Sequence, residues 1–359
     1  MSRTSQPDPA RHVVVGVDTH KYIHVAVALD QHGARLGELS VSADSKGYQE
    51  LHDWAQGYGR VKTFGVEGTG SYGVGLAKFL RRAGVRVLEV NRSDRQLRYQ
   101  HGKSDPLDAE SAARSVLSGT AINTPKSAEG ACEMIRQIKV ARDGARKARS
   151  AALIALKDIV VNAPSELRES LAVLTTVTLV QRCAGYRPGD VNTVNSSTKY
   201  TLRSLARRWV ALGEEIVEHD QLLDRLTEEA APTLREVFGI GPDVAAEMLI
   251  VFGDNPERIH SEAAFAELCG VCPIPASSGL TNKHRLYRGG HRQAIAALYR
   301  AIVVRMQNHT PTTTYVSRRT EEGLSKNDII RCLKRHLARE VYQRVMADHR
   351  VRMSHAEAA

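Results

Sequence analysis

The longest regular pattern in the chain lies near its middle and requires a long helix. Eight residues follow one another at alternating steps of three and four: Leu202, Leu205, Trp209, Leu212, Ile216, His219, Leu223 and Leu226. Such steps place side chains on one stripe of an α-helix, as in the seam of a coiled coil. His219 is the polar member, and we interpret it as a residue that sets the register of the seam. A helix of this length needs a partner that covers its apolar stripe.

A second helical run precedes this one. Its apolar residues recur at similar steps, with one slip, at Met134, Ile138, Ala141, Ala145, Ala148, Ala152, Leu156 and Ile159. Residues 185–200, rich in Ser, Thr and Asn, separate the two runs, and Pro232 ends the second. The predicted helices can pair within the chain or with another subunit. Residues 126–231 therefore form a predicted coiled-coil and dimerisation segment of a homo-oligomer, a dimer or a tetramer.

The first third of the chain alternates between strand and helix patterns. Stretches rich in β-branched residues lie at 12–29 (two runs joined by a polar turn), 35–42, 60–68 and 85–90. Helical spacing follows at 45–58 and 71–84, and a further helix begins at Pro106. A ribbon followed by such alternation predicts a mixed sheet flanked by helices. We expect an α/β domain at residues 12–125, mostly helical segments after it, and a flexible tail at residues 1–11.

The charge balance indicates a polyanionic partner. The 359 residues include 50 Lys or Arg and 40 Asp or Glu, which gives a net charge of +10. Such a basic chain favours nucleic acid. No uncharged apolar run approaches the roughly 20 residues of a membrane-spanning helix, and the polar N-terminus lacks the apolar core of a secretion signal. We expect a cytoplasmic protein without membrane contact.

The five cysteines agree with a reducing compartment, because they are few, odd in number and not preceded by an export signal. Cys269 and Cys272 form one CxxC, but His284 and His291 are poorly spaced as a second ligand pair for zinc. Buried thiols are the better interpretation.

Two predicted strands end in a carboxylate. Asp18 ends the first in VVVGVDTHK, and Glu67 ends another in TFGVEGTGS. Carboxylates are poor strand formers. A turn residue or a surface acid explains either one alone. Together, at the ends of strands in one sheet, they lie where sheet proteins assemble functional sites.

Two more acids open the helix predicted in GKSDPLDAES. Asp105 can act as N-cap, Pro106 suits the first helical position, and Asp108 falls where a capping-box acid reaches back. The same acids could face Asp18 and Glu67 at one edge of the sheet. Four carboxylates so close repel one another unless divalent cations neutralise them. Oxygen-rich sites suit Mg²⁺ or Mn²⁺, and two such ions would clamp the attacking and leaving oxygens of a phosphoryl transfer.

These motifs together resemble a known family. GVDTHK, GVEGTGSYG and KSDPLDAE look like the D-E-D-D set of an insertion-sequence transposase family whose catalytic domain has a ribonuclease-H-like, RuvC-like fold. The family includes the pilin-gene invertases and the bridge-RNA-guided recombinases. The resemblance implies that Asp18, Glu67, Asp105 and Asp108 bind the metal ions. It also implies DNA as donor and target, and a structured guide RNA that pairs with both.

Residues 232–350 fit the same family as a DNA-binding transposase domain. Gly239 and Gly241 stand in the hairpin of a helix-hairpin-helix motif, whose backbone N–H groups can face a phosphate, although an ordinary tight turn is the alternative. A run without acids follows, with the cations Lys283, Arg285, Arg288, Arg292, Arg300 and Arg305. A one-sign run interleaved with Tyr and Gly suits a phosphate backbone. We expect the hairpin and the first four cations to contact nucleic acid.

Ser277 and Ser278 precede Gly279 in a predicted loop, where a simple turn is the plain explanation. The family carries a nucleophilic serine in a Ser-Gly context, which points to Ser278, with Ser277 as the alternative. No local His–Asp pair is evident, so the metal ions are the natural activator of the hydroxyl, and the two domains must then meet within a subunit or across a dimer. The resemblance thus implies a transposase/recombinase that exchanges DNA strands through a phosphoserine link.

Three other classes stay open. A RuvC-like hydrolytic nuclease or junction resolvase would use water as nucleophile and leave the serine idle. A non-catalytic nucleic-acid-binding protein would bind no metal at the carboxylates. An actin-like sugar or acetate kinase shares the strand-end Asp but needs neither Asp105 nor Asp108, and the basic helical second half fits it poorly.

Overall fold

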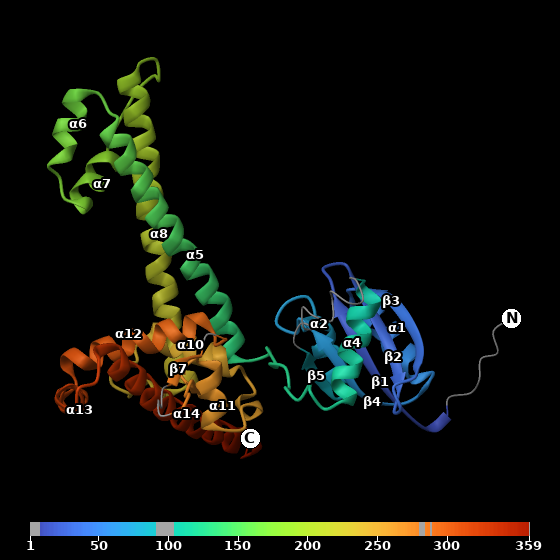
Figure 1. Ribbon diagram of the computed structural model, residues 1–359. Coiled ribbons are helices and arrows are strands. Elements are labelled where there is room, and N and C mark those ends of the chain that lie inside the picture. The colour runs from blue at the N-terminus through green and yellow to red at the C-terminus, as the bar shows by residue number, and fades with distance from the viewer. Residues whose placement is uncertain (1–7, 91–103, 280–283, 288, 359) are drawn as a thin grey trace. The chain divides into compact units, whose positions relative to one another are not determined.

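Figure 1 shows the computed structural model, which describes residues 8–90, 104–279, 284–287 and 289–358. Lys283 and Arg288, two of the predicted nucleic-acid contacts, lie outside the described residues. The chain divides into two compact units. The first comprises Met1–Ala128 with Gly253–Arg258, and the second comprises Glu129–Phe252 with Ile259–Ala359.

A five-stranded mixed sheet forms the centre of the first unit. Its strands are β1 (Asp8–Thr19), β2 (Ile23–Asp30), β3 (Arg35–Ser42), β4 (Gly59–Glu67) and β5 (Val87–Val90). Their spatial order is β3-β2-β1-β4-β5, with β1 antiparallel to β2 and parallel to β4. Since β5 is also parallel to β4, the carboxyl ends of β1, β4 and β5 lie at one edge. The predicted mixed sheet of a RuvC-like domain is confirmed.

Helices cover both faces of this sheet. They are α1 (Ser45–Gln56), α2 (Val74–Arg82) and α4 (Asp105–Leu117). Val13 and Val15 of β1 belong to the core that α1 and α2 complete, whereas Val14 packs with Ala109 of α4. Successive side chains of a strand point to opposite faces, so the even-numbered residues at the end of β1 face α4.

A glycine lets α4 lie directly on β1. A Cβ atom placed on Gly16 would overlap the carbonyl oxygen of Ala109 and the backbone nitrogen of Ala113. Both alanines are fully buried. The small residues on the two elements therefore set how deep α4 sits on the sheet, and with it the position of the helix N-terminus.

The strand β1 begins earlier than the sequence predicts. Residues 8–11, which we assigned to a flexible tail, belong to β1, since Asp8 pairs with Gly59 beyond an irregularity in the ladder. The His12 amide also donates a hydrogen bond of 2.9 Å to Gln31 Oε1. Backbone pairing thus continues past the end of the apolar pattern. The rest of the predicted tail, residues 1–7, lies outside the described residues.

Two long helices dominate the second unit. Figure 1 shows α5 (Ala131–Val161) and α8 (Val194–Ala230) side by side, with α6 (Ser165–Ala172) and α7 (Thr176–Ala184) between them in the chain. Leu202 and Leu223 of the predicted seam are buried, and His219 is half-buried. The Arg149 guanidinium of α5 stacks on Trp209 at 3.7 Å from the ring centroid. The two helical runs therefore pair within the chain.

The helix α8 begins inside the stretch that we predicted as a break. Thr193 and Ser196 form a capping box at its N-terminus, so the Ser/Thr/Asn-rich sequence that looked like a loop contains the helix start. These residue types favour caps as well as turns, because their side chains bond to nearby backbone groups.

Shorter elements complete the second unit. They are α9 (Pro232–Arg235), α10 (Pro242–Phe252), α11 (Glu262–Leu268), β6 (Pro273–Pro275), β7 (His284–Leu286), α12 (Arg292–Asn308), α13 (Thr310–Glu321) and α14 (Lys326–Ala358); the 3₁₀ turn η1 (Pro256–Arg258) belongs to the first unit. One apolar core joins them to the ends of the long helices through Cys132, Ile135, Leu223 and Leu226. The predicted boundary at residues 231/232 therefore does not separate two cores.

The cysteines behave as buried or half-buried free thiols. Burial raises the pKa of Cys269 to about 12 and that of Cys183 to about 11. Among the described residues, no helix has the length and apolar character needed to cross a membrane.

Candidate functional site

The two strand-end acids lie at neighbouring positions of the sheet edge. Asp18 and Glu67 each follow a residue pair, Val17 and Val66, that is matched across the parallel strands β1 and β4. The Thr19 hydroxyl donates a hydrogen bond of 2.8 Å to the backbone oxygen of Glu67, which ties the two strand ends together. Asp18 is almost fully buried.

The first turn of α4 supplies the second pair of acids. Ser104 occupies the N-cap position and Asp105 is the first helical residue, so our assignment of Asp105 as N-cap is wrong by one position. The Asp108 amide donates a hydrogen bond of 3.1 Å to the Ser104 backbone oxygen. Ser104 makes no side-chain cap bond. With Ser104 as N-cap, the capping-box position three residues later is Leu107, so our placement of Asp108 at that position is also wrong by one residue.

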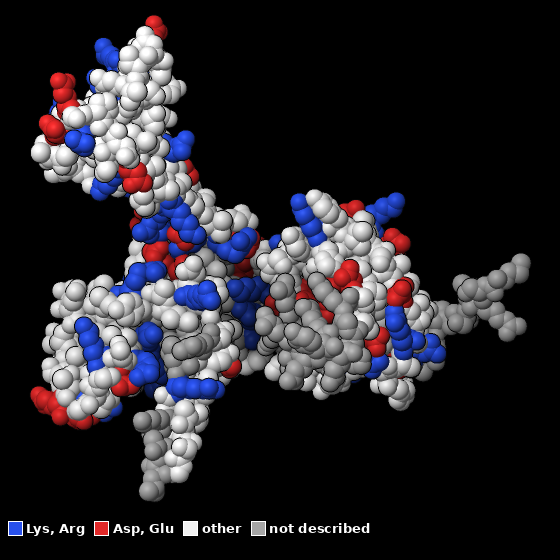
Figure 2. All heavy atoms as spheres, turned by 45° about the horizontal axis from the view of Figure 1, so that its top comes forward, with Lys and Arg blue, Asp and Glu red and all other residues white. Residues whose placement is uncertain are grey.

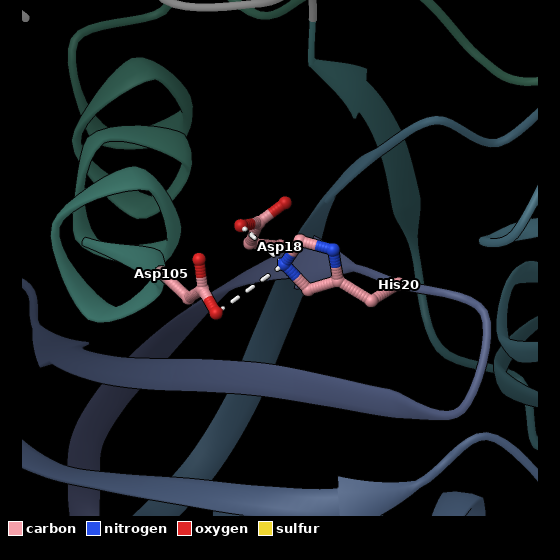
Figure 3. Close-up of side chains that lie close together, drawn as sticks. All are labelled: Asp18, His20 and Asp105. Atoms are coloured by element: carbon pink, nitrogen blue, oxygen red, sulfur yellow. Dashed lines mark ion pairs between the residues drawn. The ribbon is translucent and has the colours of Figure 1, made fainter. Parts of the chain in front are cut away.

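His20, a residue outside the predicted set, lies between two of these acids. Its Nε2 atom lies 3.2 Å from Asp18 Oδ2 and 3.4 Å from Asp105 Oδ2 (Figure 3). One potential ligand atom from each of the three residues lies within 4.8 Å of the others. Asp18 comes from the end of β1, His20 from the turn after it, and Asp105 from α4. The two-residue spacing of Asp18 and His20 was the sequence signal that could have revealed it.

The electrostatics of this cluster favour a cation. Burial raises the pKa of Asp18 above its ordinary value; the charges of Asp108 and Asp105 raise it as well, while His20 lowers it. Asp108 is therefore close enough to act on Asp18. Crowded carboxylates, one of them buried, are stabilised when a positive ion joins them. Carboxylate oxygens with one imidazole nitrogen fit a divalent cation such as Mg²⁺ or Mn²⁺.

The predicted hairpin lies between α9 and α10 and packs on α12. Gly239 has a left-handed φ of +81°, and a Cβ on it would lie 3.0 Å from the Ala301 backbone oxygen. The Arg305 Nε atom donates a 2.8 Å hydrogen bond to the Phe238 backbone oxygen. Around Gly241, by contrast, a Cβ would meet no atom within 4 Å. One side of the hairpin is thus occupied by the protein and the other is open.

The basic run splits into two groups. Arg285 on β7 and Arg292 at the start of α12 are exposed, and neither pairs with an acid within the described part of the chain. Arg300 instead bonds to Asp243 at 2.8 Å, and Arg305 is buried and bonds to Glu340 at 2.9 Å. The last two cations of the run therefore serve the protein's own packing; they were not among the four that we expect to contact nucleic acid. Figure 2 shows many Lys and Arg side chains on the visible face of the second unit.

Ser277 and Ser278 lie on an exposed loop after β6, and Gly279 adopts a left-handed φ of +55°. Within the described ranges the Ser278 hydroxyl has no hydrogen-bond partner. An exposed, unengaged hydroxyl is accessible to a large substrate.

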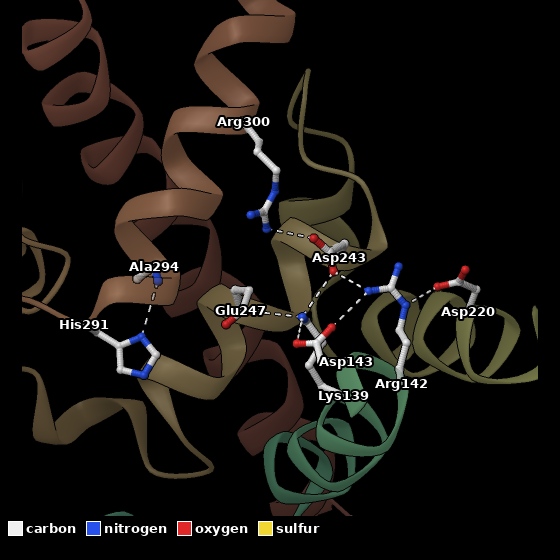
Figure 4. A network of polar contacts seen from close by, with 9 residues as sticks. All are labelled: Lys139, Arg142, Asp143, Asp220, Asp243, Glu247, His291, Ala294 and Arg300. Carbon is white, nitrogen blue, oxygen red and sulfur yellow. Dashed lines mark hydrogen bonds and ion pairs between the residues drawn. The ribbon is translucent and has the colours of Figure 1, made fainter. Parts of the chain in front are cut away.

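A second charged cluster, which we call the Lys139–Arg142 network, joins four helices. Its members are Lys139, Arg142 and Asp143 of α5, Asp220 of α8, Asp243 and Glu247 of α10, and Arg300 of α12 (Figure 4). Lys139 lies 2.7 Å from Asp143, 2.9 Å from Glu247 and 3.3 Å from Asp243. Arg142 bonds to Asp220 and, at 2.8 Å, to Asp243. Every charge in this network has an opposite charge beside it.

Two family models match the chain. A model of DEDD transposases of the IS110 type, described as "Transposase", matches residues 15–163, and one described as "Transposase IS116/IS110/IS902 family" matches residues 231–317. The first range contains the four predicted metal-binding acids, and the second contains the hairpin glycines and both serines. No curated protein matches the chain.

Proposed function

This chain belongs to the IS110 family of DEDD transposases, and we propose that it cuts and rejoins DNA by transesterification. The family implies DNA as the substrate and a divalent cation as the cofactor. The observation that supports the proposal most directly is the close approach of Asp18, His20 and Asp105 at the carboxyl end of β1. Such a donor cluster at a sheet edge suits phosphoryl-transfer chemistry.

In this proposal Asp18, Glu67, Asp105 and Asp108 would hold two divalent cations, with His20 as a further donor. A bound Mg²⁺ or Mn²⁺ polarises the phosphate and stabilises the attacking and leaving oxygens. The protein's own contribution is rigidity, because Asp18 is fixed by the sheet and Asp105 by the first turn of α4.

Ser278 is the proposed nucleophile. Its Oγ atom forms a bond to phosphorus while the bond from phosphorus to the 3′ oxygen breaks. The serine loses its proton and the 3′ oxygen gains one, so the step consumes neither water nor a redox partner. Attack by the 3′ hydroxyl of another strand reverses the step and joins new partners. The exposed position of Ser278 supports this role.

Titration calorimetry with Mn²⁺ tests the carboxylate half of the proposal. We expect wild type to bind Mn²⁺ and Asp105→Asn to bind at least about tenfold more weakly, since a ligand is lost. Glu110→Gln removes an acid of the same helix outside the cluster and is the matched control. A wild-type protein that binds no Mn²⁺, or equal affinity in Asp105→Asn, contradicts the metal site.

Denaturing electrophoresis of labelled DNA that carries the ends of the parent element tests the serine half. A covalent adduct is expected with wild type and Ser277→Ala and none with Ser278→Ala. Retention of the adduct in Ser278→Ala but not in Ser277→Ala would move the role to Ser277. Strong cleavage by Ser278→Ala without any adduct indicates a hydrolytic nuclease instead.

A structured guide RNA and a homo-oligomer complete the proposal, as the family resemblance implies. The net charge of +10 is compatible with binding both RNA and DNA. Protein purified from cells that carry the gene with its flanking DNA should retain one discrete RNA, and RNase treatment should abolish strand exchange. Light scattering should give a dimer or tetramer. Full activity of an RNA-free monomer contradicts this part.

A further inference from the structure

A cavity of about 620 Å³ lies in the second unit beside the short strand pair β6–β7. Pro273, His284 and Arg285 line it from the strands, and Arg331, Lys334 and Arg335 line it from α14. Among its lining residues, four are cations and one, Asp328, is an acid. The cavity is therefore electropositive before any ligand enters.

Lys334 is the unusual member of this lining. It is only 8% exposed, and within the described residues it has no hydrogen bond and no ion pair. Burial lowers its pKa below the ordinary value, and the nearby charge of Arg331 lowers it further. A buried ammonium group without a partner is destabilising unless an anion reaches it.

The acids nearby are already engaged. Asp328 pairs with Arg331 and accepts from the Ser325 hydroxyl, while Arg335 pairs with Glu262. Arg285 is exposed and unpaired within the described ranges. Two positive charges at the cavity, those of Lys334 and Arg285, are thus not balanced by the surrounding side chains.

The contrast with Lys139 shows that this protein does provide partners for a buried lysine. Lys139 is 6% exposed, a similar degree of burial, yet three carboxylates lie within 3.3 Å of its Nζ atom. Lys334 lies against an open cavity instead. Its counter-charge is therefore expected to come from outside the chain.

We propose that this cavity binds a phosphate group of a DNA strand, with Lys334 as the inner charge and Arg285 at the rim. A phosphate oxygen accepts charge-assisted hydrogen bonds from both side chains. Ser278 follows Pro275 of β6 by three residues, which an extended chain spans in about 10 Å. The bound phosphate therefore belongs to the strand that Ser278 attacks, close to the reacting phosphodiester. This part of the inference rests on the proposed function.

The first test uses inorganic phosphate, titrated calorimetrically into the full chain without metal or DNA. Wild type should bind phosphate, and Lys334→Met should bind about tenfold more weakly or not at all, since a hydrogen bond to a charged group is lost. Arg344→Gln removes an exposed charge of the same helix outside the cavity and should behave as wild type. Equal binding by Lys334→Met and wild type overturns the proposal, as does an equal loss in Arg344→Gln.

The second test measures affinity for a random-sequence DNA duplex by fluorescence anisotropy over a range of salt concentrations. The logarithm of the association constant falls linearly with the logarithm of the salt concentration. In Lys334→Met this negative slope should become shallower by about one, because one phosphate contact is lost. Arg285→Gln should weaken binding in the same direction. An unchanged slope in both variants means that the cavity takes only free anions, which overturns the DNA assignment.

Thermal unfolding separates binding from structure. Lys334→Met removes a buried, unpartnered charge, so the variant should unfold at a higher temperature than wild type. A lower unfolding temperature shows that Lys334 has a structural partner and overturns the proposal. Phosphate binding needs neither metal nor strand cleavage, so a failure here leaves the Ser278 adduct and Mn²⁺ titrations unaffected, and the converse also holds.

Discussion

The first unit buries Asp18 among other carboxylates, whereas the second unit buries Lys139 and Arg142 among carboxylates of opposite charge. Burial raises the pKa of Asp18 and His20 lowers it, but with Asp108 and Asp105 also raising it the pKa stays above its ordinary value. Burial also acts to raise the pKa of Asp243, but Lys139, Arg300 and Arg142 outweigh it and hold the pKa below its ordinary value. The surroundings of Asp18 therefore disfavour its ionised form, whereas those of Asp243 stabilise its ionised form.

This difference separates the proposed metal site from a network whose charges are already balanced by the protein. In the Lys139–Arg142 network the attraction between charges offsets the loss of hydration, and four helices are held together. In the Asp18 cluster His20 offsets only part of the repulsion between the acids, and under the proposed function a cation would offset more of it. The four predictions that follow perturb one side of the comparison at a time.

The largest effect is expected from Arg142→Met. It removes the guanidinium from Asp220, which is about half exposed, while Asp243 keeps Lys139 and Arg300 beside it. We therefore expect a loss of about 1.5–3 kcal/mol, the value of hydrogen bonds to charged groups. Urea unfolding, followed by the fluorescence of Trp209 with Trp54 replaced by Phe, measures this loss. A loss below about 1 kcal/mol would show that the network stabilises the second unit little.

Asp18→Asn should impair activity without lowering stability, the opposite of what we expect for Arg142→Met. The metal-free protein should be no less stable than wild type, because a buried charge disfavoured by its neighbours is removed. Metal-dependent strand cleavage should fall at least about 100-fold, and the thermal stabilisation by Mn²⁺ should disappear. Glu50→Gln, an exposed acid of α1, is the control. Lower stability of metal-free Asp18→Asn contradicts the comparison.

His20→Asn should have a smaller effect on the same cluster. Pulsed electron paramagnetic resonance of the Mn²⁺-loaded wild type should show coupling to a ¹⁴N nucleus of the imidazole, and the variant should lack it. Affinity for Mn²⁺ should fall by about tenfold, as for other supporting groups at metal sites. Identical spectra from both proteins would leave His20 outside the coordination sphere.

Acid should weaken the network gradually. The pKa of Asp243 is lowered on folding, so its contribution to stability is present above its ordinary pKa of 3.8 and is lost as the pH falls through the lower folded value. Urea midpoints measured from pH 7 to pH 3 should therefore decline less steeply in Asp243→Asn than in wild type. As a baseline, the exposed Arg225–Glu229 pair should contribute only about 0.3–0.5 kcal/mol.

Local sequence patterns predicted the strand ends and the helix start on which the acids lie, but not the side chains that surround these acids. The strand ends, the helix at Pro106 and the spacing of Asp105 and Asp108 follow from alternation and capping, which act over a few residues. The choice of Asp105 over Ser104 as N-cap failed because both residue types cap well and adjacent positions compete. His20 shares the face of Asp18 by the same alternation, so the two-residue spacing in the sequence already places it beside that acid.

The roles of the cations depend on contact partners that are far away in the sequence. Arg300 meets Asp243, 57 residues away, and Arg305 meets Glu340, 35 residues away, so nothing in the basic run itself distinguishes them from Arg285 and Arg292. Lys334 looks like any lysine of a basic helix until burial shows that it has no acid beside it. Whether a cation serves the fold or a ligand depends on tertiary contacts that no short motif records.

Gly16 carries no charge, yet the distance between the acids of β1 and those of α4 depends on it. Any side chain there would lift the helix from the strand and carry Asp105 and Asp108 away from Asp18, while leaving every acid in the sequence. An inventory of the D-E-D-D residues would still count such a chain as intact. Whether a variant of this transposase is active therefore has to be judged from the small residues beneath α4 as well as from the four acids.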